Sequence, residues 1–164
     1  MRKIIVIGCP GSGKTTFSLK LKEKTGLPLF HLDAIWHKAD RTHICREEFD
    51  AHLAEILAMD AWIIDGDYSR TLQRRMNACD TIVFLDFPMP VCLKGAIARL
   101  GQKREDMPWM DTELDPTLQR EIEEYQGTKR PVVLSLIEKY RTQKEVFVFL
   151  SREEADRFLD GINL

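Results

Sequence analysis

Short apolar runs alternate along this chain with longer segments in which apolar residues recur every three or four positions. The apolar runs lie at residues 3–8, 27–33, 61–67, 80–88 and 144–150. Continuous runs of this length, rich in β-branched residues, are typical of parallel strands that are buried on both faces. The pattern therefore predicts five strands.

The longer segments have the periodicity of helices. Between the second and third runs, for example, Phe49, Leu53 and Ile56 follow one another at helical spacing. Gly26 is expected to end the first helix, and Ser151 is expected to cap the beginning of the last one. The expected helices span residues 14–26, 46–60, 69–78, 90–100, 118–126, 131–141 and 151–161.

Strands that alternate with helices are typical of α/β folds, in which right-handed crossovers build a parallel sheet covered on both faces. Ligands of such folds bind beyond the carboxyl ends of the strands. Cys9, Asp33, Asp65 and Pro88 lie at the ends of expected strands. We therefore expect the chemistry of this protein at one edge of the sheet.

Length and charge narrow the range of functions. The 164 residues are enough for a single domain over residues 1–164 with a substantial core. The 24 basic and 26 acidic side chains give a net charge of −2, whereas a protein that coats DNA needs a basic face that displaces counterions. This near balance of charges argues against direct nucleic-acid binding. A local basic cleft sized for one or two phosphates is compatible with the same balance.

Cysteines and histidines lack the spacing of metal ligands. No two cysteines form a Cys-x-x-Cys pair, and no two histidines form a His-x-x-x-His pair. Free thiols in a reducing cytoplasm are therefore expected. The residues concerned are Cys9, Cys45, Cys79, Cys92, His31, His37, His43 and His52.

The N-terminal apolar run, from Ile4 to Ile7, is too short for the apolar core of a signal peptide or for a membrane span. The sequence therefore predicts a cytoplasmic protein that has no membrane partner.

The segment GCPGSGKT, which begins at Gly8, matches the phosphate-binding pattern Gly-x-x-x-x-Gly-Lys-Ser/Thr and lies between a predicted strand and a predicted helix. Backbone N–H groups of such a loop surround phosphate oxygens, and the helix N-terminus adds partial positive charge. Lys14 is expected to neutralise the β- and γ-phosphates of ATP, and Thr15 to bind Mg²⁺. A glycine turn without a ligand is the alternative. The residues expected to contact the nucleotide are Gly8, Cys9, Pro10, Gly11, Ser12, Gly13, Lys14, Thr15 and Thr16.

Two residues near the end of the third expected strand are candidates for the metal and the acceptor. Asp65 closes that strand, where a second acidic member of the magnesium shell is expected; capping of the next turn is the alternative. Arg70 lies one turn further on, and its planar guanidinium suits a phosphate or a carboxylate. A solvated helix charge is the alternative for Arg70.

The end of the second expected strand supplies further candidates. The carboxylate of Asp33 could accept a hydrogen bond from an acceptor hydroxyl or act as its base. Trp36 could form a wall of the pocket, although a tryptophan is more often packed in the core.

A polar stretch from Gly101 to Pro116 contains little apolar periodicity. Segments of this length are often binding loops or lids, so we predict a flap over about residues 100–126; a plain loop is the alternative. Arg99 and Arg130 lie at the two roots of this flap, where they would stabilise charge on a phosphoryl group during transfer.

With these residues assembled, the chain resembles the adenylate-kinase-like branch of P-loop kinases. The stretch WIIDGDYSRTLQR resembles the Asp-Gly-Phe-Pro-Arg-Thr segment of that branch. Asp65, Gly66 and Arg70 match its acidic residue, its glycine and its acceptor-phosphate arginine, whereas Asp67 and Tyr68 replace its Phe-Pro pair. This resemblance implies that Gly66, Tyr68 and Arg70 contact the substrate.

The stretches HLDAIWHK, DAWIIDGDYSRTL, ADRFL and ARL resemble more closely the bacterial proteins that are labelled DNA topology modulation proteins. The resemblance implies a three-layer P-loop NTPase sandwich with a five-stranded parallel sheet of order 2-3-1-4-5 and a lid insertion. It also implies the scaffold of an ATP-dependent small-molecule kinase.

The leading interpretation is a phosphotransferase that moves the γ-phosphate of Mg-ATP to a hydroxyl or phosphate of a small acceptor. Lys14, Asp33, Arg99 and Arg130 are its expected catalytic residues. A regulatory nucleotide-binding protein, whose ATP occupancy switches a surface for DNA or a protein partner, is one alternative. A plain ATPase is another. The sequence leaves the acceptor and the choice between ATP and GTP open.

Overall fold

The structure, a computed structural model, describes residues 1–162 and contains one five-stranded parallel sheet of order β2-β3-β1-β4-β5. The predicted number, direction and order of the strands are therefore confirmed. The strands are β1 (Lys3–Gly8), β2 (Leu29–His31), β3 (Trp62–Asp65), β4 (Thr81–Leu85) and β5 (Glu145–Phe149).

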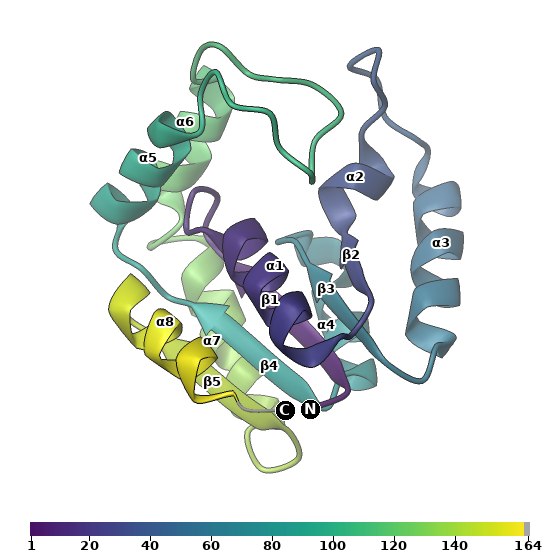
Figure 1. The fold of residues 1–164 in the computed structure, drawn as a ribbon. Helices are drawn as coiled ribbons and strands as arrows, with labels where there is room; N and C mark the ends of the chain where they lie inside the picture. Colours follow the sequence, from purple (N-terminus) through teal and green to yellow (C-terminus); the bar gives the residue numbers. More distant parts are fainter. Residues whose placement is uncertain (163–164) are drawn as a thin grey trace.

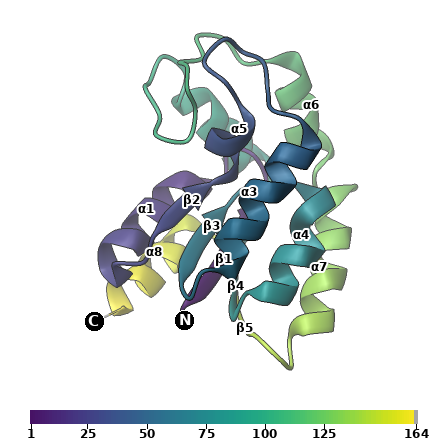
Figure 2. The ribbon, with the colours of Figure 1, turned by 90° about the vertical axis from the view of Figure 1, so that its right-hand side faces the viewer.

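Helices cover both faces of the sheet, as Figures 1 and 2 show. One face carries α1 (Lys14–Thr25) and α8 (Arg152–Gly161), which contact each other. The other face carries α3 (Arg46–Ala58), α4 (Ser69–Ala78) and α7 (Lys129–Tyr140). The predicted three-layer α/β architecture is therefore confirmed.

The core lies on the middle strands, as their sequence predicts. Four consecutive residues of β1, Ile4 to Ile7, have no exposed side-chain surface. Burial of each such side chain contributes about 1.5–3 kcal/mol. A strand with four consecutive buried apolar residues must be covered on both faces, and β3 and β4, which flank β1, are buried in the same way.

Local signals at helix ends also act as predicted. Gly26 ends α1 with a φ of 67°, and its N–H donates to the carbonyl of Lys22. The Ser151 hydroxyl accepts a hydrogen bond from the backbone N–H of Glu154 at the start of α8. Both interactions satisfy backbone groups that a helix end leaves without partners.

The second apolar run is shorter as a strand than predicted. β2 ends at His31, and the chain continues as the short helix α2 (Leu32–Trp36). Leu32 is fully buried, and Asp33 lies in the first turn, where a carboxylate interacts favourably with the helix dipole. Asp33 and Trp36 therefore project from a helix and not from the end of a strand.

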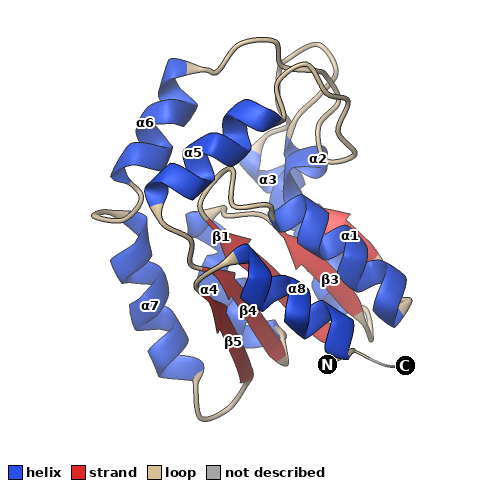
Figure 3. Ribbon diagram, turned by 60° about the vertical axis from the view of Figure 1, so that its left-hand side comes forward, coloured by secondary structure: helices blue, strands red, loops and turns tan. Residues whose placement is uncertain are grey.

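Helices α5 (Met89–Ala98) and α6 (Pro116–Glu124) lie beyond the carboxyl ends of the strands (Figure 3). The predicted flap thus ends in the helix α6, and its irregular part is residues 100–115, which we call the cover loop. Among the described residues, no helix is both long and apolar enough to cross a membrane.

Candidate functional site

The phosphate-binding loop joins β1 to α1, and its conformation depends on glycine. Gly11 and Gly13 have φ values of 80° and 94°, which side chains disfavour. Gly11 also packs against the backbone of α5: a Cβ there would lie 2.0 Å from the carbonyl oxygen of Cys92. The consensus pattern requires Gly13 but not Gly11, so packing against α5 is the reason for the second glycine.

We expect Gly11→Ala to destabilise the protein more than Gly26→Ala. Both positions have positive φ, which costs about 1–2 kcal/mol for an L side chain, but no atom lies within 4 Å of a Cβ built at Gly26. The clash at Gly11 should add at least about 2 kcal/mol, and each kcal/mol lowers Tm by about 2–4 °C at this size. Thermal unfolding of both variants measures the difference. Equal shifts would contradict the packing argument.

The two polar residues that begin α1 are both engaged. The Lys14 ammonium donates to the carbonyl oxygens of Gly8 at 2.8 Å and Cys9 at 3.1 Å. The Thr15 hydroxyl donates to the Asp106 carboxylate at 2.9 Å. Lys14 is therefore held at the loop by carbonyl groups that phosphate oxygens can replace.

One cavity of about 1310 Å³ lies between the phosphate loop, α2, the segment after β3, α5 and the cover loop. Its wall brings together most of the residues that the sequence predicted. The predicted residues that line it are Pro10, Gly11, Gly13, Lys14, Thr15, Thr16, Asp33, Trp36, Asp65, Gly66, Tyr68 and Arg99.

Asp65 forms a pair with His31 that the sequence did not reveal. Both carboxylate oxygens lie 2.9 Å from His31 Nδ1, and Asp65 is only 4% exposed. Burial lowers the pKa of His31, but the hydrogen bond with Asp65 and the charge of that carboxylate outweigh it, so the pKa is raised. The predicted role of Asp65 in the metal shell stays a prediction, since its carboxylate faces an imidazole.

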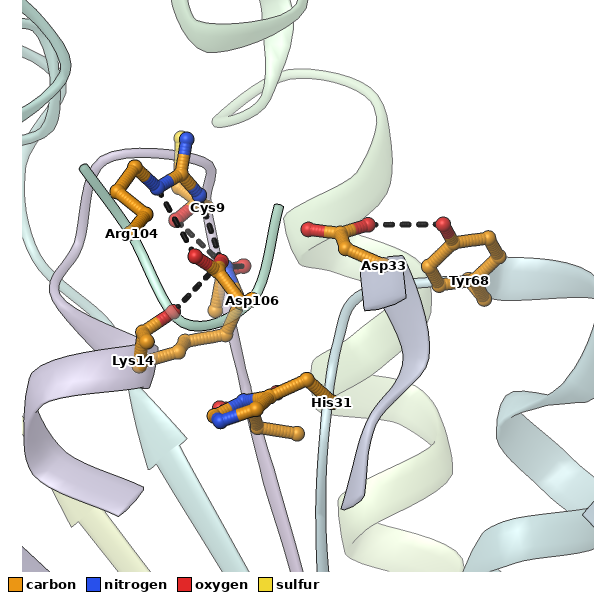
Figure 4. A network of polar contacts seen from close by, with 10 residues as sticks. Cys9, Lys14, His31, Asp33, Tyr68, Arg104 and Asp106 are labelled. Carbon is orange, nitrogen blue, oxygen red and sulfur yellow. Dashed lines mark hydrogen bonds and ion pairs between the residues drawn. The ribbon is translucent and has the colours of Figure 1, made fainter. Parts of the chain in front are cut away.

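Asp33 is fixed by a tyrosine. The Tyr68 hydroxyl donates to Asp33 Oδ1 at 2.8 Å (Figure 4). The Tyr68 ring stacks on Phe49 with ring centroids 5.2 Å apart and meets the edge of Trp36 at 6.3 Å. Burial and the neighbouring Asp33 carboxylate both raise the pKa of Tyr68, so this hydroxyl remains a donor.

A buried arginine that sequence reasoning missed forms hydrogen bonds with the backbone of the loop after β3. Arg75 is fully buried in α4 and donates to the carbonyl oxygens of Gly66 and Tyr68, each at 3.0 Å. Burial lowers its pKa to about 10. Arg75 therefore positions Tyr68, and through it Asp33.

Two predicted arginines point elsewhere. Arg70 forms two hydrogen bonds, of 3.0 and 2.7 Å, with Asp50 of α3, and Arg130 forms two, of 2.7 and 2.8 Å, with Asp86 at the end of β4. Within the described chain neither arginine lines the cavity. Each would have to leave a carboxylate to reach a substrate, so their predicted roles stay predictions.

Two further arginines line the cavity, Arg99 and Arg152. Arg99 follows α5; burial and then the neighbouring Arg104 lower its pKa. Arg152 donates to the carbonyl oxygens of Gly11 and Ser12, each at 3.2 Å. Sequence reasoning missed Arg152, although its position directly after the fifth strand was a signal.

The cover loop reaches down to the phosphate loop. Asp106, which is 3% exposed, accepts the hydrogen bond from the Thr15 hydroxyl at 2.9 Å. Arg104 Nε donates to Asp106 Oδ1 at 2.9 Å, and Arg104 Nη2 donates to Oδ2 at 2.6 Å. Burial raises the pKa of Asp106, but Arg104 and the Thr15 hydroxyl outweigh it, so the pKa is lowered and the carboxylate is ionised. Figure 4 shows Asp106 between Arg104 and the start of α1.

A second contact ties the cover loop to the opposite wall. The Trp109 ring meets the edge of His37, with centroids 5.2 Å apart, and the Arg41 guanidinium lies 5.1 Å from the Trp109 centroid. The cover loop therefore closes over the cavity in this structure, from the phosphate loop to the segment after α2.

Comparisons with known proteins identify the fold. No protein-family model matches the sequence, and no curated protein is matched by it. A shikimate kinase from Acinetobacter baumannii, solved in complex with shikimate, has a TM-score of 0.65 and 13% identity over 99% of this chain and 90% of its own. A shikimate kinase from Bacteroides thetaiotaomicron has a TM-score of 0.57 and 18% identity over 96% and 93%.

A sugar kinase from Janibacter sp. HTCC2649 has a TM-score of 0.56 and 17% identity, over 98% of this chain and 91% of its own. These identities are low, so the likeness is one of fold. The chain therefore has the fold of these P-loop kinases, with the strand order that the resemblance implied.

Proposed function

We propose that this protein is a phosphotransferase that moves the γ-phosphate of Mg-ATP to a hydroxyl group of a small acceptor. One observation carries the proposal: the phosphate loop and the oriented carboxylate of Asp33 line the same cavity, beneath the cover loop.

The nucleotide end of the cavity is positively charged. Lys14 would exchange the carbonyl groups of Gly8 and Cys9 for the β- and γ-phosphates. Arg99, Arg104 and Arg152 line the same end and would offset the charge of the phosphates. Thr15 would bind the magnesium ion, which neutralises charge on the phosphates.

The acceptor end of the cavity carries acidic side chains. Asp33 and Asp67 line it, and Lys129 lies 3.4 Å from Asp67. Trp36 and Tyr68 supply aromatic walls. The arginine that would bind an acceptor phosphate, Arg70, is paired outside the cavity. An uncharged, hydroxyl-bearing acceptor fits this end better than a phosphate does.

The chemical step follows from this placement. As the acceptor oxygen forms a bond with the γ-phosphorus, Asp33 takes the hydroxyl proton, and the bond to the ADP oxygen breaks. Tyr68 keeps one Asp33 oxygen occupied and so presents the other to the acceptor. The cover loop would exclude water, which favours transfer over hydrolysis.

The names of the structural neighbours agree with this assignment, because shikimate and sugars both carry hydroxyl groups. The resemblance to DNA topology modulation proteins adds no chemistry to it and stays a prediction, as do the single domain over residues 1–164 and its flap.

Transfer of label from γ-labelled ATP tests the function. The acceptors are matched pairs: nucleosides and their monophosphates, and uncharged sugars or polyols and their phosphates. We expect the uncharged member of a pair to be used with a kcat/KM at least about tenfold higher, equivalent to about 1.4 kcal/mol. Preference for the phosphorylated members would contradict the hydroxyl assignment. ATP-dependent binding of DNA or of a protein without any transfer would favour the regulatory alternative.

A further inference from the structure

The cover loop places a buried carboxylate on the phosphate loop, and the proposed phosphoryl transfer does not use it. Asp106 lies 91 positions after Thr15 in the sequence, yet its Oδ2 accepts the Thr15 hydroxyl hydrogen bond at 2.9 Å. It is 3% exposed and carries its charge beside Arg104. Arg104 and the Thr15 hydroxyl satisfy this buried charge, and they hold the carboxylate at the mouth of the phosphate site.

The position of Asp106 distinguishes two possible roles, that of a stand-in for a terminal phosphate and that of a ligand of the metal ion. An anion that occupied the place of a terminal phosphate would face the ammonium group of Lys14. Lys14 is instead bound to the carbonyl oxygens of Gly8 and Cys9. Asp106 contacts Thr15, the residue whose hydroxyl faces the magnesium ion in loops of this type. The carboxylate is therefore on the metal side of the loop.

The distance suits a shared ion. Magnesium binds oxygen at about 2.0–2.1 Å in an octahedron, so two adjacent ligand oxygens lie about 2.8–3.0 Å apart. Thr15 Oγ1 and Asp106 Oδ2 are 2.9 Å apart. An ion can bind both oxygens without moving them apart, once the hydroxyl proton turns away from the carboxylate and Arg104 Nη2, which lies 2.6 Å from the same Oδ2, gives up its hydrogen bond.

Both candidates have two engaged oxygens, Asp65 through His31 Nδ1 and Asp106 through Arg104, but of the two it is Asp106 that contacts Thr15. Within residues 1–162 no group of three or more His, Cys, Asp or Glu residues is arranged to hold a metal. A magnesium ion does not require such a group, because it commonly takes one or two protein ligands and completes its shell with phosphates and water.

We propose that Thr15 Oγ1 and Asp106 Oδ2 are adjacent ligands of the magnesium ion that accompanies the nucleotide. The inference rests on the proposed function, since it assumes that the phosphate loop binds a nucleotide. Because Asp106 belongs to the cover loop, the ion would join this loop to the phosphate loop. Metal binding would then favour the closed cavity and release Arg104 from part of its ion pair.

The test measures binding without turnover. The affinity for ADP is determined by calorimetry with and without Mg²⁺, and bound Mn²⁺ is counted by electron paramagnetic resonance in the presence of ADP. Asp106→Asn should bind metal-free ADP like the wild type. The factor by which Mg²⁺ increases the affinity for ADP should be smaller than in the wild type by about tenfold or more. Asp106→Ser is a second variant, with a side chain small enough for the same space.

Glu123→Gln is the control, because it removes a carboxylate charge from an exposed position of α6 that does not line the cavity. It should keep the Mg²⁺ effect. An unchanged Mg²⁺ effect in both Asp106 variants would overturn the inference. So would tighter ADP binding with and without Mg²⁺, which would make Asp106 an internal competitor of the phosphates. Wild-type protein that binds no nucleotide would instead overturn the proposed function.

Discussion

Replacement of Lys14 by Met is expected to lower the rate of phosphoryl transfer by at least about a hundredfold. Removal of a single preorganised donor to a developing negative charge costs about 10²–10³ in kcat, and Lys14 is the residue whose full positive charge is fixed at the loop. Methionine keeps most of the length of the side chain, so packing at the start of α1 is preserved. Release of ADP in the presence of an accepted substrate measures the rate.

Lys20→Met is the control for a general loss of positive charge. Lys20 lies on the same helix, but it is exposed and pairs with Asp156 of α8 at 2.8 Å. A surface pair of this kind contributes little, about 0–1 kcal/mol, so this variant should transfer phosphate at the wild-type rate. If Lys14→Met also retained that rate, the phosphate loop would not be the centre of the reaction.

The parts of this protein that the sequence predicted are those that local pattern determines. Ile4 to Ile7 leave no polar position to face water, so β1 had to be covered on both faces. Gly13 and Lys14 belong to a motif whose spacing requires one loop conformation. Ser151 caps α8 because the backbone N–H that it accepts from, that of Glu154, is only three residues away. Such interactions are complete within about ten residues of sequence.

The parts that sequence reasoning missed depend on contacts between distant segments. Nothing around Arg70 indicates that Asp50, twenty positions earlier, would face it from α3. The contact between Asp106 and Thr15 crosses 91 positions and arises in a polar stretch without periodicity. Side-chain partners of this kind are decided by how the helices pack, and the pattern of apolar residues does not record them.

This difference has a consequence for the function. The residues that we propose to bind phosphates are local in sequence, whereas those that we propose to select the acceptor come from three segments that meet only in the fold. Asp33 follows β2, Tyr68 follows β3, and Arg75 of α4 fixes the loop between β3 and α4. A general likeness to P-loop kinases therefore predicts the nucleotide better than it predicts the acceptor.

We expect Asp33→Asn to reduce kcat by about 10²–10⁴, the contribution of a positioned general base. The amide oxygen of asparagine can still accept the Tyr68 hydrogen bond, so the acceptor end should keep its shape. The amide has no basic lone pair for the acceptor proton, however. The affinity for Mg-ADP should not change, because Asp33 lies at the other end of the cavity.

Two further variants separate the chemistry of Asp33 from its charge and position. Asp60→Asn removes the same charge at an exposed position before β3 and should leave kcat unchanged. Tyr68→Phe removes only the hydrogen bond to Asp33, so it should reduce kcat less than Asp33→Asn does, with no effect on Mg-ADP affinity. An Asp33→Asn variant that loses Mg-ADP affinity but keeps kcat would place Asp33 at the nucleotide. One that keeps both would mean that the acceptor hydroxyl needs no base, as a loose transition state with little proton transfer allows.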